Sequence, residues 1–171
     1  MDEQLIENNT KILMSFDQRV IRGRVRIELE RMYHDFAQIT IEINDKSRPV
    51  IIVYDINEYN KLQKYEFAIC EDYPFKPPSI FFQNRPYKEF LQISHSPQEL
   101  KLFKKISGLD CLCCSSITCV GNWSPGYMMT NIIDEIRKIR EYKRNVIIKI
   151  IADKIKKQYL IEDIELDSWL F

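Results

Sequence analysis

The feature that most constrains the fold is the hydrophobic periodicity, which changes twice along the chain. Residues 16–36 repeat apolar side chains every three or four positions, the period of an amphipathic helix. Between residues 37 and 83 the period falls to two, and the turn residues at 44–49 separate β-branched and aromatic runs, which predicts about four antiparallel strands. The helical period returns over 128–139 and again over 146–159, so the element order predicts an α+β fold.

The length of the chain fits one domain with short additions. It has 171 residues, of which 45% are hydrophobic, enough to bury a core. We divide it into an N-terminal extension at 1–15, a main domain at 16–160 and an acidic C-terminal tail at 161–171. Residues 84–126 show weak periodicity, apart from a short helix expected at 97–105. An irregular segment this long inside a compact domain is usually functional.

Charge and composition argue against several classes of function. The 25 Lys and Arg residues balance the 25 Asp and Glu residues, which disfavours electrostatic binding to nucleic acid. Four glycines are too few for a glycine-rich phosphate loop, and we expect no cofactor. No apolar run is long enough to cross a bilayer, and the first residues are polar. We therefore expect neither a membrane span nor a secretory signal, and an intracellular protein of the cytoplasm or nucleus.

The cysteines are unevenly distributed. Four of the five fall within nine residues, namely Cys111, Cys113, Cys114 and Cys119. An odd number of cysteines indicates free thiols in a reducing compartment, so the cluster is a reactive thiol, a metal site or packing. Adjacent cysteines are a poor arrangement for one tetrahedral zinc ion. We therefore expect no metal, and one reactive thiol whose companions mainly pack as small apolar side chains.

Two motifs carry a resemblance to a known family. Residues 73–78 read Tyr-Pro-Phe-Lys-Pro-Pro, and residues 108–112 read Gly-Leu-Asp-Cys-Leu, followed by Trp-Ser-Pro at 123–125. In this order, and with these flanking elements, they resemble ubiquitin-conjugating enzymes over roughly residues 16–140. The resemblance implies that family's fold: an N-terminal helix, a four-stranded antiparallel meander, an active-site loop and C-terminal helices.

What the resemblance implies about activity is acyl transfer through a cysteine thioester. The cysteine accepts the C-terminal carboxyl group of ubiquitin, or of a ubiquitin-like modifier, from an activating enzyme. It then passes this group to a lysine of a protein substrate, often with the help of a ubiquitin ligase. Cys111 matches the family's cysteine best. Trp123 lies farther along the chain from it than in the family, so Cys113 and Cys114 are alternative nucleophiles.

The resemblance also implies roles for other residues. The family's His-Pro-Asn tripeptide is absent, and we expect Asn122 and Trp123 to support the active-site loop. The expected contacts with the ligase and the activating enzyme are Arg19, Arg22, Phe75, Ser124 and Pro125.

Three alternative hypotheses fit the same residues. The missing tripeptide favours a catalytically inactive variant of the same fold that acts as a binding scaffold. Relatives that conjugate other ubiquitin-like modifiers often lack the tripeptide too, so the modifier need not be ubiquitin. The third hypothesis is a zinc-binding module that merely resembles the family.

Overall fold

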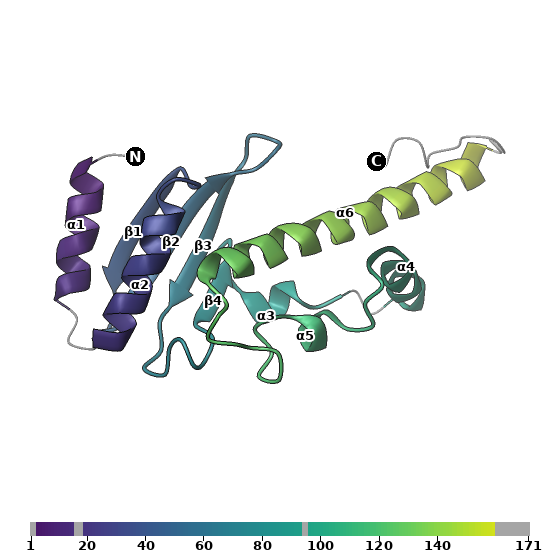
Figure 1. Cartoon of the computed structure of the whole chain (residues 1–171). Coiled ribbons are helices and arrows are strands. Elements are labelled where there is room, and N and C mark those ends of the chain that lie inside the picture. The colour runs from purple at the N-terminus through teal and green to yellow at the C-terminus, as the bar shows by residue number, and fades with distance from the viewer. Residues whose placement is uncertain (1–2, 16–18, 94–95, 160–171) are drawn as a thin grey trace.

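The computed structural model describes residues 3–15, 19–93 and 96–159, and it confirms an α+β fold. Within these residues two N-terminal helices, α1 (Glu3–Met14) and α2 (Arg19–Met32), precede an antiparallel sheet, and further helices follow it (Figure 1). The helix expected over 16–36 is thus the shorter α2. The N-terminal extension forms the extra helix α1, and the acidic tail at 161–171 lies outside the described residues.

The sheet is a meander in which each strand pairs with the next. Its strands are β1 (Gln38–Ile43), β2 (Pro49–Ile56), β3 (Leu62–Ala68), β4 (Ser79–Phe82) and β5 (Arg85–Pro86). The turn between β1 and β2 lies where the sequence predicts it, at residues 44–49. The Asn44 side chain stabilises this turn by accepting hydrogen bonds from the N–H groups of Lys46 and Arg48. The prediction of four strands missed β5, which follows a turn where Gln83 and Asn84 have positive φ angles of 52° and 61°. No glycine marks this turn in the sequence.

Over the described residues 87–93 and 96–159, four helices follow the sheet: α3 (Tyr87–Phe90), α4 (Pro97–Ser107), α5 (Leu112–Ser115) and α6 (Met129–Tyr159). The short helix expected at 97–105 is confirmed as α4. The prediction of two separate C-terminal helices is wrong, because α6 is continuous over 31 residues. Residues 140–145 contain neither glycine nor proline, and their arginine, lysine and glutamate residues favour a helix, so the two patterns fuse.

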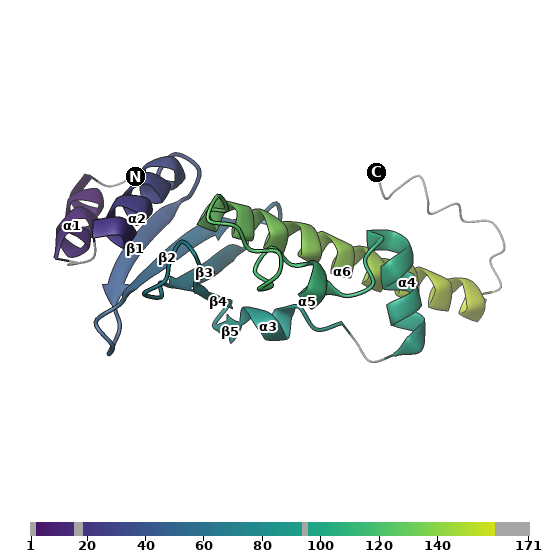
Figure 2. The ribbon, with the colours of Figure 1, turned by 60° about the horizontal axis from the view of Figure 1, so that its bottom comes forward.

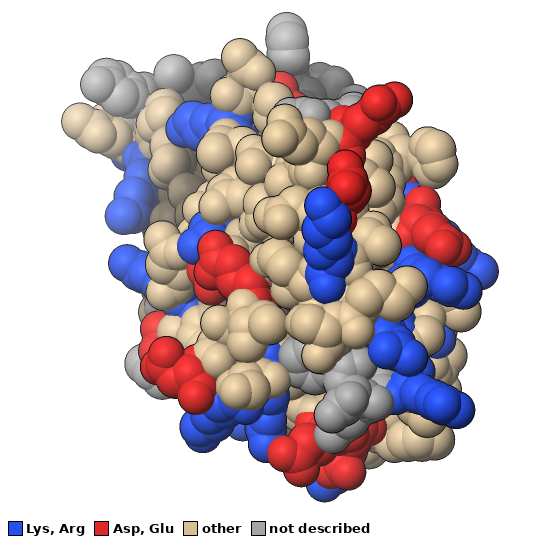
Figure 3. Space-filling view, turned by 90° about the vertical axis from the view of Figure 1, so that its left-hand side faces the viewer, with Lys and Arg blue, Asp and Glu red and all other residues tan. Residues whose placement is uncertain are grey.

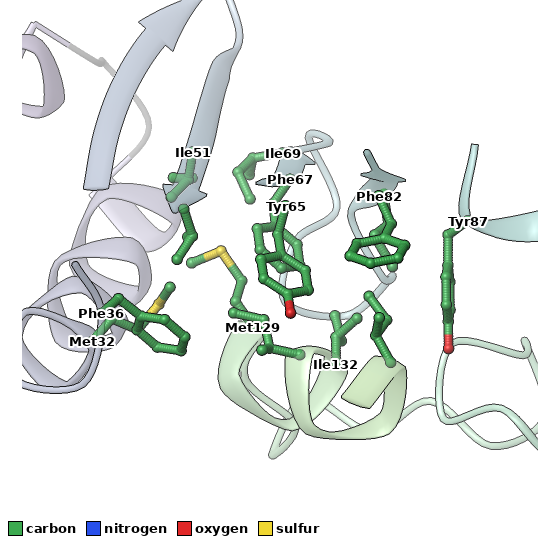
Figure 4. Packing of buried hydrophobic residues seen from close by; sticks show 14 of the residues in the cluster. Met32, Phe36, Ile51, Tyr65, Phe67, Ile69, Phe82, Tyr87, Met129 and Ile132 are labelled. Atoms are coloured by element: carbon green, nitrogen blue, oxygen red, sulfur yellow. The ribbon is translucent and has the colours of Figure 1, made fainter. Parts of the chain in front are cut away.

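The core lies between one face of the sheet and helices α2 and α6. Figure 4 shows side chains from three strands meeting those of both helices, and all of them are buried: Met32, Phe36, Ile51, Tyr65, Phe67, Phe82, Met129 and Ile132. The register places Ile51 opposite Phe67 and Val53 opposite Tyr65, so alternate residues of β2 and β3 form one apolar surface. Helix α6 extends beyond the sheet and packs against α4 (Figure 2), and near its middle the rings of Tyr142 and Phe103 are 6.3 Å apart.

Helix α1 covers the edge of the sheet that strand β1 forms. The buried Asn9 side chain donates from Nδ2 to the Ile39 carbonyl oxygen at 2.8 Å and accepts from the Ile41 N–H at 3.0 Å. These are backbone groups of the edge strand β1, so one amide replaces a missing strand partner. Figure 3 views the molecule from this side, where acidic and basic side chains are interspersed. Among the described residues, no helix is both long and apolar enough to cross a membrane.

We predict that Asn9→Ala lowers the free energy of unfolding by about 1–3 kcal/mol, because a buried N–H and a buried carbonyl lose their partner. Urea denaturation followed by circular dichroism measures this change. Asn8→Ala is the matched control, since Asn8 is the exposed neighbour on the same helix. Equal stability of the two variants would contradict the role given to Asn9.

Candidate functional site

The cysteine cluster begins where helix α4 ends. Gly108 terminates α4 in the left-handed conformation, with a φ of 71°, and Cys111 then occupies the N-cap position of α5. Asp110, between them, forms an ion pair with Lys104 of α4. Leu112 is 1% exposed and anchors the short helix in the core, so the neighbouring cysteines are held at the surface.

The structure brings the three candidate nucleophiles to one place. The sulfur of Cys111 lies 2.8 Å from that of Cys113, which lies 3.8 Å from that of Cys114. Cys113 and Cys114 are exposed and Cys111 is half-buried, and all three are free thiols. All three sulfurs lie within 4.8 Å of one another, so they are also the residues that could hold a metal ion. Cys119 is not part of this group.

The close contacts shift the pKa values of Cys111 and Cys114 in opposite directions. A hydrogen bond from the Cys113 thiol, followed in importance by the backbone amide of Cys114, lowers the pKa of Cys111 to about 7. The neighbouring thiols, Cys111 first, raise the pKa of Cys114 to about 11. At neutral pH roughly half of Cys111 is therefore thiolate while Cys114 stays protonated, which favours Cys111 as the nucleophile of these two.

Asn122 holds the loop that carries the thiols. Its Nδ2 donates to the backbone carbonyl oxygens of Cys114, at 2.7 Å, and Ser116, at 3.0 Å. A side-chain amide has two N–H donors, and both are used here. Asn122 therefore supports the loop backbone and has no amide hydrogen left for a group bound at Cys111.

Glu135 of α6 holds the next part of the loop and was not predicted from the sequence. Its carboxylate accepts hydrogen bonds from the Ser116 hydroxyl at 3.2 Å and the Ile117 N–H at 3.1 Å. Burial raises the pKa of Glu135. A cavity of about 410 Å³ lies beside this contact, between the cysteine loop and α6, with Leu112 and Ser115 in its wall.

Trp123 joins the two sequence motifs. Its Nε1 donates to the backbone carbonyl oxygen of Pro74 at 2.8 Å, and its ring lies 6.4 Å from that of Tyr73 and 5.9 Å from that of Tyr127. The Tyr73–Pro74 peptide bond is cis. The Trp-Ser-Pro segment is thereby fixed against the loop between β3 and β4, although 49 residues separate the bonded groups.

The predicted partner-contact residues are all at least partly accessible. Phe75 is 71% exposed, and Ser124 and Pro125 are exposed beside the Trp123 anchor. Arg19 is exposed at the start of α2, and Arg22 is half-exposed and donates to the Met14 carbonyl oxygen. The start of α2 and the two motif loops lie at the same end of the sheet, at the bottom of Figure 1.

Glu28 of α2 is a buried residue of the site that was not predicted from the sequence. Its side chain is 1% exposed, and Oε1 accepts hydrogen bonds from Arg24 Nε at 2.5 Å and from the Tyr73 hydroxyl. Oε2 accepts from the Met129 N–H, at 2.7 Å, where α6 begins. Arg24 also donates to the Tyr127 carbonyl oxygen at 2.6 Å. The Glu28 carboxylate thus ties α2 to the loop after β3 and to the start of α6, and its partner Arg24 adds the end of the Trp-Ser-Pro loop.

A signal for Glu28 was present in the sequence. Glu28 follows Ile21 and Val25 and precedes Met32 at helical spacing, so it falls on the apolar stripe of α2, where a charge needs a buried partner. The cysteines held a second signal: Cys111 and Cys114 are separated by two residues, the C-x-x-C spacing of many metal sites. The expectation of no metal overlooked this spacing.

Comparisons of this chain with protein-family models, curated proteins and solved structures found no match. The function is therefore argued from the residues and their geometry.

We predict that Glu28→Ala lowers the free energy of unfolding by about 3–5 kcal/mol, because it leaves Arg24, the Tyr73 hydroxyl and the Met129 amide without their shared partner. Urea denaturation measures the change. Glu30→Ala is the control on the same helix, since Glu30 pairs with Arg26 at 3.6 Å on the surface. That exposed pair contributes less than about 1 kcal/mol. A loss for Glu28→Ala as small as that of the control would contradict the role of Glu28.

We predict that iodoacetamide alkylates Cys111 with a midpoint near pH 7 in metal-free buffer, because its thiolate forms there. Raising the pH through 7 should therefore increase the rate, and mass spectrometry with fragmentation identifies the modified cysteine. Cys113→Ala removes the main hydrogen-bond donor and should move the midpoint up toward the ordinary value for cysteine, whereas Cys119→Ala should leave it in place. An unchanged midpoint in Cys113→Ala would show that Cys113 does not set the acidity.

Proposed function

We propose that this protein is a conjugating enzyme for ubiquitin or a ubiquitin-like modifier, with Cys111 as the thioester-forming residue and a ubiquitin-conjugating-type fold. The observation that carries the proposal is the hydrogen bond from Trp123 to Pro74. It joins the Trp-Ser-Pro segment to the Tyr-Pro-Phe loop, so that the two motifs of the resemblance form one surface next to the cysteine loop.

The geometry of Cys111 fits acyl transfer between proteins. Its sulfur lies on a surface loop, where the thioester of a bulky carrier protein has access, and its exposed neighbours leave the approach open. Leu112 anchors the backbone between Cys111 and Cys113, and Asn122 holds it at Cys114, so that little of the loop must be ordered when the donor arrives.

The proposed reaction has two displacement steps. In the first, the Cys111 thiolate attacks the carbonyl carbon of the modifier's C-terminal thioester on the activating enzyme. The new S–C bond replaces the old one, and the activating enzyme's thiolate leaves. In the second, a neutral lysine amine of the substrate attacks the same carbon. An amide forms, the Cys111 thiolate leaves and the amine's proton passes to solvent.

The exposed residues around the site are proposed to receive the protein partners. Phe75 presents a large apolar ring, and the exposed Ser124 and Pro125 follow Trp123, which bonds to the carbonyl oxygen of Pro74 next to Phe75. An exposed aromatic ring on a fixed loop is typical of an interface anchor. Arg19 and Arg22 on α2 add positive charge for an acidic partner surface. Free thiol chemistry of this kind requires a reducing compartment, so we propose an intracellular location.

One observation favours the inactive scaffold as a second candidate. Both N–H groups of Asn122 bind backbone carbonyls, so this amide does not supply the oxyanion donor that the missing His-Pro-Asn tripeptide provides in the family. A scaffold would keep the Phe75 surface and lose thioester formation. The loading assay below separates the two candidates.

We predict that incubation with activating enzyme, ATP and ubiquitin gives an adduct that thiol reductants cleave, because Cys111 forms a thioester. Non-reducing gels measure the adduct. Cys111→Ala should abolish it, and Cys111→Ser should replace it by an oxyester that resists reductants. Other modifiers, each with its own activating enzyme, are assayed in parallel.

Cys119→Ala is the matched control, since Cys119 belongs to the sequence cluster but not to the group of close sulfurs. It should load as the wild type does. No adduct with any modifier would refute the enzyme and favour the scaffold, and full loading of Cys111→Ala would refute the assignment of the nucleophile.

A further inference from the structure

The three thiols of the active-site loop form a cluster that one nucleophile does not explain. Acyl transfer uses the sulfur of Cys111 alone, yet Cys113 and Cys114 place two more exposed sulfurs within 4.8 Å of it and of each other. The expected packing role does not account for them either, because both side chains are exposed, whereas Leu112 between Cys111 and Cys113 is buried.

The spacing of the sulfurs is close to what a tetrahedral metal ion requires. Zinc–sulfur bonds of about 2.3 Å place two ligand sulfurs about 3.8 Å apart in a tetrahedron. The Cys113 and Cys114 sulfurs are 3.8 Å apart already. Those of Cys111 and Cys113, at 2.8 Å, must separate by about 1 Å, which a small side-chain rotation on an exposed loop provides.

The backbone that carries the three sulfurs is held independently of any ion. Leu112 is buried between the first two cysteines, and Asn122 binds the carbonyl oxygen of Cys114. A site whose ligands are already positioned loses little conformational freedom on binding. The arrangement is therefore more than the chance proximity of three mobile side chains.

The cluster supplies three ligands and leaves the fourth position to solvent. In the part of the chain that the structure describes, the group contains these three cysteines alone, and their exposure lets water complete the shell. Zinc, a borderline ion, accepts thiolates and water together, whereas softer copper(I) favours sulfur throughout. Three thiolates with one open position therefore suit zinc.

We propose that Cys111, Cys113 and Cys114 bind one zinc ion with an open fourth position. Three Zn–S bonds form, and each thiol that is still protonated loses its S–H bond and releases the proton to the buffer. A second step rests on the proposed function, in which Cys111 forms the thioester. The bound zinc ion then blocks the Cys111 sulfur, and no modifier is transferred to it until zinc is removed. Zinc would then regulate conjugation.

Metal binding to the full-length, reduced protein tests the site directly. Titration with Zn²⁺ against a chromophoric chelator should give one ion per chain, and Co²⁺ should give the intense thiolate-to-metal charge-transfer band of a cysteine site. Cys113→Ala and Cys114→Ala should each weaken zinc binding by about tenfold or more, because each loses one of three ligands. Cys119→Ala and Cys70→Ala should bind as the wild type does. Absence of the charge-transfer band, or equal losses in the control variants, would overturn the site.

The loading assay then tests regulation. Zinc should suppress the wild-type adduct, and a chelator should restore it, while the thioester on the activating enzyme is monitored in the same lanes to show that the donor still forms. In Cys114→Ala, zinc should lower loading by a much smaller factor, measured against that variant's own rate. Zinc binding without loading under any condition would refute the proposed function alone. Loading that zinc leaves unchanged would refute the switch.

Discussion

The buried carboxylate of Glu28 is the interaction on which the arrangement of the site depends. An ionised carboxylate inside a protein is stable only when hydrogen bonds replace its lost water, and here three donors do so: Arg24, the Tyr73 hydroxyl and the Met129 amide. These donors come from a helix, from the loop after β3 and from the start of α6. Because hydrogen bonds to a carboxylate have preferred directions, Glu28 fixes where those three segments meet.

The cysteine loop is built on this junction by shorter-range contacts. Trp123 bonds to the loop that Tyr73 begins, and Asn122, its neighbour in the chain, bonds to the carbonyl oxygen of Cys114. Glu135 adds a contact from the α6 helix, whose first turn Glu28 holds. The thiols are thus connected to the core through backbone groups, while their sulfurs remain free to react. The same accessibility that suits a thioester also suits a metal ion, so the two proposed properties compete for one sulfur.

The elements of the fold were largely predictable because their signals are local. Period-two alternation revealed β1 to β4, and apolar spacing revealed α2 and the two ends of α6. The fusion of those ends depends on the weak preferences of residues 140–145, which contain no strong stop signal. The role of Asn9 was not predictable, since it depends on where α1 docks against the edge of β1, a contact across 30 residues.

Several residues of the site could be predicted from the sequence, but the hydrogen bonds between them could not. The motifs indicated Cys111, Asn122 and Trp123, but not that both amide hydrogens of Asn122 would be used on the loop. That the pKa of Cys111 is lowered while that of Cys114 is raised depends on sulfur–sulfur distances of a few ångströms, which sequence spacing does not determine. Glu28 stood on an apolar stripe, yet its partners at Tyr73 and Met129 are visible only after folding.

The central claim is that Cys111, among three adjacent thiols, carries the modifier. Its most direct test is to load the metal-free protein and quench it rapidly in acid, which protonates the thiols and stops exchange between them. Proteolysis and fragmentation by mass spectrometry then locate the modifier's C-terminal residue. The remnant is predicted on the sulfur of Cys111. A remnant on Cys113 or Cys114 at the earliest quench times, or none on this loop, would contradict the claim.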